Sequence, residues 1–413
     1  MKLGYNTARP LVMHIDLNSC FATVEQQARP RLRGRPVAIV NRRTEHTMIV
    51  TCSYEAKAVG VKLGMRLKDA KKLCPELIGI ESDPPKYKFV YHQLMRIMND
   101  YSAYVRMKSI DEGVIDFSET TARIGERNLV DIGYEIKQRL WDEVGVAMNC
   151  NVGISTNRFL AKTAAGLNKP NGLDVITHHN LREVLAGLEL TDITGIASRL
   201  EKRLNAVGIY TPLEFLDADE EILQKVVFKS VDGSYWHKRL RGWEVDKRDF
   251  SLKSAGRQFV MDGYRLPHAD VLKRLHHLCE ETGAKVRSKG MLARGVTVYA
   301  RTYDYGGWHA KYMAPLPFFS NEAIYAHARR LFEGAPNGIK MIAVTCYGLQ
   351  PVDIHSRQLQ LFGDEIAREQ AITSAVDEIN ERYGKRVIHS ADTLGSDTYL
   401  KEKIPFGSTR YME

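Results

Sequence analysis

The order of strand-like and helical segments in the first 175 residues constrains the fold more than any other feature of the sequence. Short apolar runs predict buried strands, and apolar residues that recur every three to four positions predict helices. Strand-like segments fall at 11–17, 104–118 (as two halves) and 149–154, and helical segments fall at 87–98, 129–140 and 159–167. With residues 21–83 set aside as an inserted subdomain, the order is β-α-β-β-α-β. That order predicts a ferredoxin-like arrangement, and hence an α+β fold.

Three acids stand out because they lie where predicted strands end or meet. Asp16 closes the first strand, and Asp111 and Glu112 lie between the two halves of 104–118. Paired strands are about 4.8 Å apart, so these carboxylates can approach within a few ångströms. Clustered carboxylates raise each other's pKa, and Mg²⁺, which prefers oxygen ligands, removes that cost. Two such ions can activate a hydroxyl and stabilise a leaving pyrophosphate. The alternative is that each acid only makes a strand end soluble.

A group of basic and phenolic side chains lies in segments that adjoin the acids. These residues are Tyr54, Lys57, Arg158, Lys162 and Lys169. Lys and Arg would neutralise a triphosphate, and a Tyr hydroxyl could donate to a phosphate oxygen. Taken one at a time, each of these residue types is more often a solvated surface residue.

Residues 192–209 suggest contact with a nucleic-acid backbone. The segment is predicted as a helix, a tight turn that contains Gly195, and a second helix rich in Lys and Arg. Backbone N–H groups at a helix start can hold a phosphate without reading sequence. An ordinary helical hairpin is the alternative.

Net charge narrows the class of partner. The 413 residues include 59 Lys plus Arg and 50 Asp plus Glu, which gives a formal charge of +9. This excess favours an anionic partner, although ordinary soluble proteins can also be basic. The apolar runs are far shorter than the ~18 residues of a membrane span, and the first ten residues lack the apolar core of a signal peptide. The cysteines are scattered singly, which fits a reducing cytosol better than a disulfide framework. We therefore expect a cytoplasmic protein with no membrane contact.

Four segments together resemble the signature motifs of Y-family translesion DNA polymerases. They are residues 14–26, 109–117, 153–172 and 193–209, in the family's order and at similar separations. The resemblance covers about residues 11–390 and is strongest to bacterial DNA polymerase IV-like enzymes. Asn18 and the segment 55–57 instead resemble the catalytic subunit of DNA polymerase V.

The resemblance implies a right-hand polymerase with a ferredoxin-like palm, small fingers, a helical helix–hairpin–helix thumb and an α/β little-finger domain. The implied division is palm 1–20 and 84–177, fingers 21–83, thumb 178–243, linker 244–255, little finger 256–352 and C-terminal tail 353–413, the last with one helix at about 365–383. Residues 248–356 contain 15 Lys plus Arg and 9 Asp plus Glu, a net charge of +6. We expect this domain to hold duplex phosphates in a salt-sensitive way.

The same resemblance implies roles for the acids and for the nucleotide contacts. Asp16 and Asp111 would bridge two Mg²⁺ ions, the main-chain carbonyl of Leu17 would be a further ligand, and Glu112 would complete the site at the primer 3′-hydroxyl. That hydroxyl attacks the α-phosphate of a dNTP; the sequence does not distinguish Mg²⁺ from Mn²⁺. The implied nucleotide contacts are Val50, Thr51, Tyr54, Lys57 and Lys169. The implied DNA contacts of the thumb are Gly195, Ala197, Lys202 and Arg203.

Phe21 falls at the family's steric-gate position, where a bulky ring would collide with a ribose 2′-hydroxyl. The alternative is a core Phe at a strand–helix junction. Four positions depart from the polymerase IV pattern. Asn18 stands where Asp is usual, and Cys20 replaces a usual aromatic residue. Lys57 replaces an Arg and so loses the bidentate fork, and Ala197 interrupts a Gly-hydrophobic-Gly hairpin.

A peptide near the end of the chain resembles a bacterial sliding-clamp binding motif. Its anchors are Gln358, Leu359, Leu361 and Phe362. The expected partners are therefore primer–template DNA, a dNTP and a sliding clamp, and we expect a monomer.

Two other functions would use parts of the same pattern. A non-catalytic relative could bridge DNA and a clamp, but the intact acids argue against it. A structure-specific two-metal nuclease could carry the helical hairpin, but the steric-gate and triphosphate segments argue against that. With no evident exonuclease segment, we expect low-fidelity synthesis without proofreading.

Overall fold

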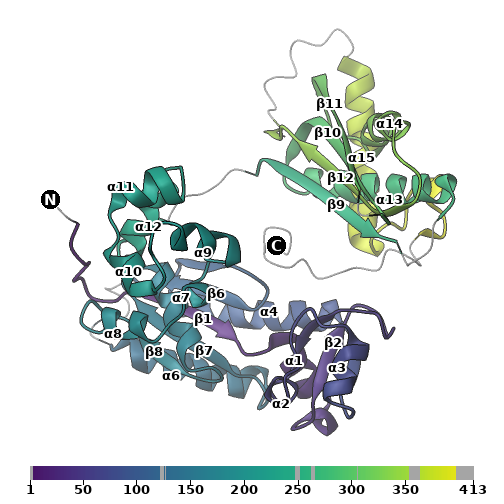
Figure 1. Ribbon diagram of the computed structural model, residues 1–413. Coiled ribbons are helices and arrows are strands. Elements are labelled where there is room, and N and C mark those ends of the chain that lie inside the picture. The colour runs from purple at the N-terminus through teal and green to yellow at the C-terminus, as the bar shows by residue number, and fades with distance from the viewer. Residues whose placement is uncertain are drawn as a thin grey trace. The chain divides into compact units, whose positions relative to one another are not determined.

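The protein is described from a computed structural model. The structure describes residues 3–120, 125, 127–246, 252–261, 266–304, 306–352 and 363–396, with the side chains of 363–367 left out. The chain forms two compact units, one within Met1–Arg248 and the other within Asp249–Glu402, which are treated separately (Figure 1). No helix in the described part of the chain is both long and apolar enough to cross a membrane.

A five-stranded sheet forms the centre of the first unit. Its strands, in spatial order, are β5 (Val105–Met107), β6 (Glu112–Asp116), β1 (Val12–Leu17), β7 (Cys150–Ser155) and β8 (Leu173–Val175). β1 is antiparallel to both of its neighbours. Along the chain, α4 (Pro84–Asn99) precedes β5 and β6, and α6 (Leu129–Arg139) precedes β7. The predicted β-α-β-β-α-β order and the α+β class are therefore confirmed.

The two faces of this sheet differ because side chains alternate along each strand. Met13, Ile15 and Leu17 point into a core that they share with α4 and α6. His14 and Asp16 lie on the opposite face, and α7 (Arg158–Leu167) covers part of that face (Figure 1). The contact is close, because a Cβ on Gly153 would lie 2.0 Å from the carbonyl oxygen of Ala161 on α7. Glycine at 153 therefore lets the helix lie directly on the strand.

The inserted segment forms a small sheet of its own. Its strands, in spatial order, are β3 (Ile49–Cys52), β2 (Val37–Val40) and β4 (Ile78–Glu81), and its helices are α1 (Cys20–Ala28), α2 (Tyr54–Ala58) and α3 (Leu67–Leu73). A separate apolar cluster that includes Ala38, Val40 and Leu77 lies between the sheet and α3.

The remainder of the first unit is helical. Its helices are α8 (Leu181–Ala186), α9 (Ser198–Asn205), α10 (Pro212–Asp217), α11 (Glu220–Ile222) and α12 (Asp232–Leu240). The prediction of a helix from residue 192 up to the Gly195 turn is wrong. A three-residue 3₁₀ turn, Leu190–Asp192, takes its place, and Gly195 has φ +99°, which ends any helical path.

The second unit is a sheet covered by helices. Its strands, in spatial order, are β11 (Gly307–Phe318), β10 (Met291–Thr302), β12 (Ile339–Tyr347) and β9 (Ser254–Val260), and β13 (Gln350–Pro351) pairs with β10. α13 (His268–Arg287) and α14 (Asn321–Phe332) pack on the sheet through one apolar core. β9 begins inside the segment expected to be a linker.

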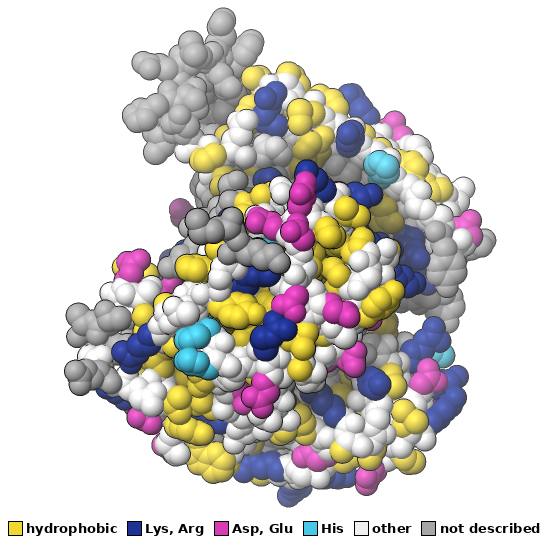
Figure 2. Space-filling model, turned by 60° about the vertical axis from the view of Figure 1, so that its left-hand side comes forward, with side chains coloured by type: hydrophobic (Ala, Val, Ile, Leu, Met, Phe, Trp, Pro, Cys, Tyr) yellow, Lys and Arg dark blue, Asp and Glu magenta, His cyan; other side chains and the backbone are white. Residues whose placement is uncertain are grey.

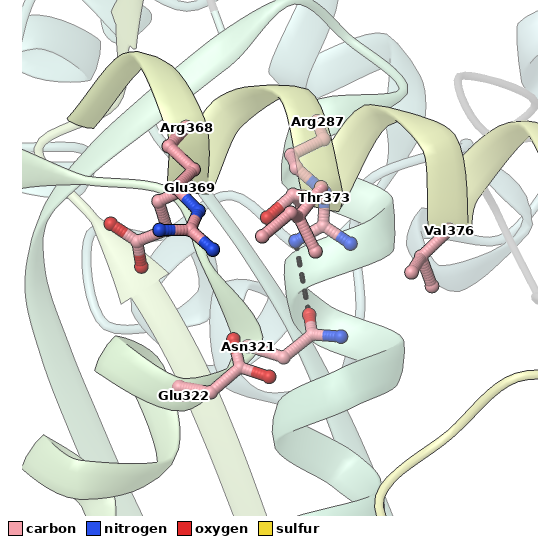
Figure 3. Close-up of a pocket in the computed structure, with 8 residues that line it drawn as sticks. Arg287, Asn321, Glu322, Arg368, Glu369, Thr373 and Val376 are labelled. Atoms are coloured by element: carbon pink, nitrogen blue, oxygen red, sulfur yellow. Dashed lines mark hydrogen bonds between the residues drawn. The ribbon is translucent and has the colours of Figure 1, made fainter. Parts of the chain in front are cut away.

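The chain after β13 is not only a polar tail. α15 (Gly363–Tyr383) lies beside α13 and α14, and Arg287 holds Asp377 through two contacts of 2.6 and 2.8 Å. A cavity of about 410 Å³ lies between these helices (Figure 3). Beyond α15, the buried carboxylate of Glu280 accepts hydrogen bonds from Arg386, from Thr393 and from the backbone of Ser390. Residues 384–396 are therefore part of the second unit.

Charged side chains of both signs are interspersed on the face of the molecule shown in Figure 2. The excess charge of +9 thus forms no single patch on that face. In the second unit, alternation along β10 places Tyr299 and Arg301 on the exposed side of the strand, with Val298 and Ala300 in the core. The basic excess of this unit therefore includes side chains on an exposed sheet face.

Candidate active site

The ends of two neighbouring strands bring the acids together. Asp16, near the end of β1, is directly opposite Glu112, the first residue of β6. Asp111 comes one residue earlier, and its carbonyl oxygen accepts a hydrogen bond of 2.8 Å from the backbone of Leu17. Strand pairing alone therefore fixes the separation of Asp16 and Glu112, as the sequence predicts.

Each of two carboxylates is already contacted by a cation. The Lys162 ammonium donates to Glu112 Oε2 at 2.6 Å, and the Lys169 ammonium donates to Asp16 Oδ2 at 2.8 Å. His14, only 1% exposed, places Nε2 3.2 Å from the same oxygen of Glu112. Lys162 and Lys169 thus lie at the site, at the positions where positive charge stabilises the two acids.

The donor set suits a hard divalent cation. Ligand atoms of His14, Asp16 and Glu112 all lie within 4.8 Å of one another. Carboxylate oxygens are the preferred ligands of Mg²⁺, whereas an imidazole nitrogen is not, and the His14 ring is already turned to Glu112. Asp111 is not in this closest group, and its carboxylate accepts a hydrogen bond from the Ser109 hydroxyl.

Burial and charge act on two of the acids in opposite directions. Burial raises the pKa of Asp111, and the charges of Asp16 and Glu112 raise it further, against a lowering by Ser109. Burial also acts to raise the pKa of Glu112, but hydrogen bonds from His14 and Lys162 lower it to about 2. Of these two acids, Asp111 is therefore the one whose ionised form is unfavourable, and a nearby divalent cation would stabilise that form.

A second group of side chains lies on the Asp16 side of the site. Lys57, on α2, donates to the Ser19 hydroxyl at 2.7 Å, and its ammonium lies 4.4 Å from the centroid of the Tyr54 ring. Burial raises the pKa of the Tyr54 hydroxyl, and so does the charge of Asp16. Because Lys169 contacts Asp16 directly, the structure brings Tyr54, Lys57 and Lys169 to one side of the acids. Arg158 is instead bound to Glu244 and Asp246.

Phe21 lies at the start of α1 and is held by stacking. It is 4% exposed, and its ring centroid is 4.4 Å from that of Tyr87, with an angle of 14° between the planes. Val50, on β3, belongs to the same apolar core, and Thr51 follows it on the strand. The ring of Phe21 is therefore fixed in place five residues after Asp16.

Asn18 joins the end of β1 to the loop that carries Lys169. Its Oδ1 accepts from the backbone of Asn171 at 2.8 Å, and its Nδ2 donates to Asn151 Oδ1 at 2.9 Å. The Nδ2 of Asn151 in turn donates to the carbonyl of Asn168 at 3.0 Å. Asn151 and His14 were not among the site residues predicted from the sequence. Polar residues inside otherwise apolar strands were the signal for both.

We expect Asn18→Ala to lower the free energy of unfolding by about 2–4 kcal/mol, because it leaves buried polar groups without partners. Urea titration measures this loss. Asn18→Asp separates the two contacts: it keeps the acceptor for Asn171 but places a buried carboxylate against the Oδ1 of Asn151, so it should also lose stability. Equal stability of Asn18→Ala and the unaltered protein would contradict the role given to this amide.

The thumb candidates occupy one turn and the helix after it. A Cβ on Gly195 would lie 3.1 Å from the ring of Trp236, and Ala197 is the N-cap residue of α9. Lys202 and Arg203 are exposed on α9. The clamp-motif anchors Gln358, Leu359, Leu361 and Phe362 lie outside the described residues.

Comparisons with known proteins give one consistent result. Residues 15–166 match the impB/mucB/samB family, and residues 253–361 match the C-terminal domain of that family. A DNA polymerase IV of Moorella thermoacetica is 32% identical over 397 residues, which cover 93% of this chain and 96% of the relative. DNA polymerase IV 1 of Bacillus subtilis is 28% identical over 392 residues, 93% of each chain.

Solved structures agree with the sequence relatives. A Y-family DNA polymerase chimera, Dbh-Dpo4(243-245)-Dbh, matches with a TM-score of 0.70 at 25% identity, covering 82% of this chain and 99% of that one. An insertion ternary complex of Dbh DNA polymerase matches with a TM-score of 0.56 at the same identity and coverage.

Proposed function

The chain belongs to the impB/mucB/samB family and is a Y-family, polymerase IV-like translesion DNA polymerase, and we propose that the Asp16–Asp111–Glu112 cluster carries out its nucleotidyl transfer. The observation that carries this proposal is the pairing of Asp16 with Glu112 across β1 and β6, with Asp111 beside them. Carboxylates gathered at one sheet edge and flanked by lysines suit a reaction between a hydroxyl and a triphosphate.

The acids would hold two Mg²⁺ ions, and Mn²⁺ has the same ligand preference. Asp16, Asp111 and the main-chain carbonyl of Leu17 would supply ligands to them. When bound, the ions lower the pKa of the primer 3′-hydroxyl and offset charge on the leaving pyrophosphate. Glu112, oriented by His14 and Lys162, would lie at the 3′-hydroxyl.

The cations on the Asp16 side would bind the dNTP triphosphate. Lys169 would exchange its contact with Asp16 for a phosphate oxygen, and Lys57 would exchange its contact with Ser19. Tyr54 would donate its hydroxyl to the same group, since the phenol keeps its proton at neutral pH. Val50 and Thr51 would lie against the incoming nucleotide, and the Phe21 ring would exclude a ribose 2′-hydroxyl.

Primer extension tests this function. The full chain is mixed with labelled primer–template, dNTPs and Mg²⁺, on an undamaged template and on templates with a single lesion. We expect extension on both kinds of template, and loss of extension when EDTA removes the divalent cation. No extension by the unaltered protein on any template would refute the proposed function.

We further propose that DNA is held by both units through its phosphates. Gly195, Ala197, Lys202 and Arg203 would contact the backbone in the first unit, and the basic sheet face that includes Arg301 would do so in the second unit. Phosphate contacts carry no sequence information, so binding should be salt-dependent and largely independent of sequence. We propose that the chain acts as a monomer in the cytoplasm, at a bacterial sliding clamp.

Replacing both Leu361 and Phe362 by Ala is expected to abolish stimulation by a sliding clamp and to leave basal synthesis unchanged. Two apolar anchors that fill a shallow groove carry most of the energy of such a contact. Primer extension with and without a loaded clamp measures the effect. Gln360→Ala, in the same peptide but outside the anchor set, is the matched control. Full stimulation of the double variant would contradict the motif.

A further inference from the structure

A second group of cations lies on the other side of the acids from Lys57 and Lys169. Arg106 is on β5, Lys108 follows β5, and Arg158 is the first residue of α7. Arg106 pairs with Val114, which pairs with His14 across the sheet, and the Lys108 backbone donates to the carbonyl of Glu112 at 2.9 Å. By strand alternation, Arg106 thus lies on the face that carries Asp16 and Glu112. Lys108, the first residue after β5, lies near Arg106 and Arg158, whose charges act on its ammonium.

The charges of Arg158 and Lys108 are only partly compensated. Arg158 is 3.8 Å from the carboxylate of Asp246, which also accepts from Arg239 at 2.6 Å, and its backbone donates to Glu244. The Lys108 ammonium forms no ion pair with any residue that the structure describes. The pKa of Lys108 is lowered to about 8, mainly by burial and also by the nearby charges of Arg158 and Arg106. The charges of Asp246 and Glu244 act to raise it. A half-buried ammonium among cations is stabilised by an anion.

The position of these cations relative to the acids suggests which anion they would bind. Across the sheet the order is Lys108, Glu112, Asp16 and then Asn151, which is linked to the Lys169 loop. The triphosphate belongs on the Lys169 side under the proposed function. The primer must approach with its 3′-hydroxyl at Glu112, so the phosphates behind that hydroxyl fall toward Lys108.

We propose that Arg106, Lys108 and Arg158 form a binding site for phosphodiester groups of the primer strand next to its 3′ end. This inference rests on the proposed function, because it takes the direction of the primer from the roles of Glu112 and Lys169. Glu244 and Asp246 keep Arg158 in place at the start of α7. Lys108 is then the member of the group with most to gain from a phosphate.

The test measures DNA affinity separately from nucleotide affinity. Primer–template binding to the full chain is followed by fluorescence anisotropy without dNTP, at several KCl concentrations. Lys108→Ala should weaken binding about 3- to 10-fold near 0.1 M salt and reduce the slope of log affinity against log salt by about 1. Lys108→Glu should weaken it further, and Lys108→Arg should restore it. The KM for dNTP should not change.

Controls separate this site from general charge and from stability. Lys71→Ala, an exposed lysine on α3, removes the same charge elsewhere and should leave DNA affinity unchanged. Melting curves check that each variant folds, and Arg106→Ala provides a second test of the site. Unchanged DNA affinity and salt slope in folded Lys108→Ala and Arg106→Ala would overturn the proposal, as would a raised KM for dNTP with unchanged DNA affinity. Failure of the unaltered protein to extend primers would instead overturn the proposed function.

Discussion

Asp111→Ala and Glu112→Ala are each expected to abolish primer extension, with a loss of at least about a thousand-fold in rate, or about 4 kcal/mol of activation free energy. Burial and the charges of Asp16 and Glu112 raise the pKa of Asp111, and a divalent cation would offset this cost. Without Asp111, the proposed metal site loses a ligand. Glu112 is the common partner of His14 and Lys162, so its removal also leaves those two groups without their acceptor. Single-turnover extension of a labelled primer measures both effects.

The controls for these variants separate chemistry from folding and from DNA binding. Glu112→Gln keeps the shape of the side chain and removes its charge, so it should fold well and still extend poorly. Asp131→Ala, an exposed acid on α6, should extend at the normal rate. Melting curves and primer–template anisotropy of Glu112→Gln and Asp131→Ala should be close to those of the unaltered protein. Extension that tolerates both Asp111→Ala and Glu112→Ala would show that the reaction takes place elsewhere.

Phe21→Ala is expected to lower discrimination against ribonucleotides by about 10- to 100-fold, the range that corresponds to a steric clash of about 1–3 kcal/mol. The ring is 4% exposed and stacked on Tyr87, so it cannot turn aside to admit a 2′-hydroxyl without losing that contact. Single-nucleotide kinetics with a matched dNTP and rNTP give the ratio of kcat/KM values. The change should come from a gain with the rNTP.

A buried Phe elsewhere tests whether loosened packing alone could produce this result. Phe215, in α10, is fully buried in the helical part of the first unit. Phe215→Ala should lower stability by about 3–5 kcal/mol and leave the ratio for dNTP over rNTP unchanged. If Phe21→Ala lowers stability without changing that ratio, Phe21 is a core residue and not the gate.

The sequence predicts the centre of the site because that prediction depends only on where each acid falls within its own strand. Asp16 is next to the last residue of one strand and Glu112 is the first residue of another, so antiparallel pairing of these strands places the two carboxylates side by side. The same reasoning cannot supply partners that depend on loop geometry. Lys169 is 153 residues from Asp16, and their contact depends on the path of the loop that Asn18 holds.

Two failures of prediction have a similar origin. The segment before Gly195 contains Asp192, Ile193 and Thr194, which are weak helix formers, and it is too short to propagate a helix before the positive φ of that glycine. Residues 384–396 are polar, which suggested a tail, yet their polar groups are satisfied by the buried carboxylate of Glu280. A buried acid that binds a distant segment leaves no periodic pattern in the sequence.

The anchoring of α15 and residues 384–396 on the second unit limits the reach of the clamp peptide. β13 ends at Pro351 and α15 begins at Gly363, so the proposed anchors fall in the sequence between two elements of the second unit. Ten residues separate Val352 from Gly363, and a fully extended chain spans at most about 3.6 Å per residue. A segment of this length cannot place its midpoint more than about 20 Å from either of its ends. Such a short connecting segment would keep a bound clamp close to the second unit and would reduce the conformational entropy lost on binding.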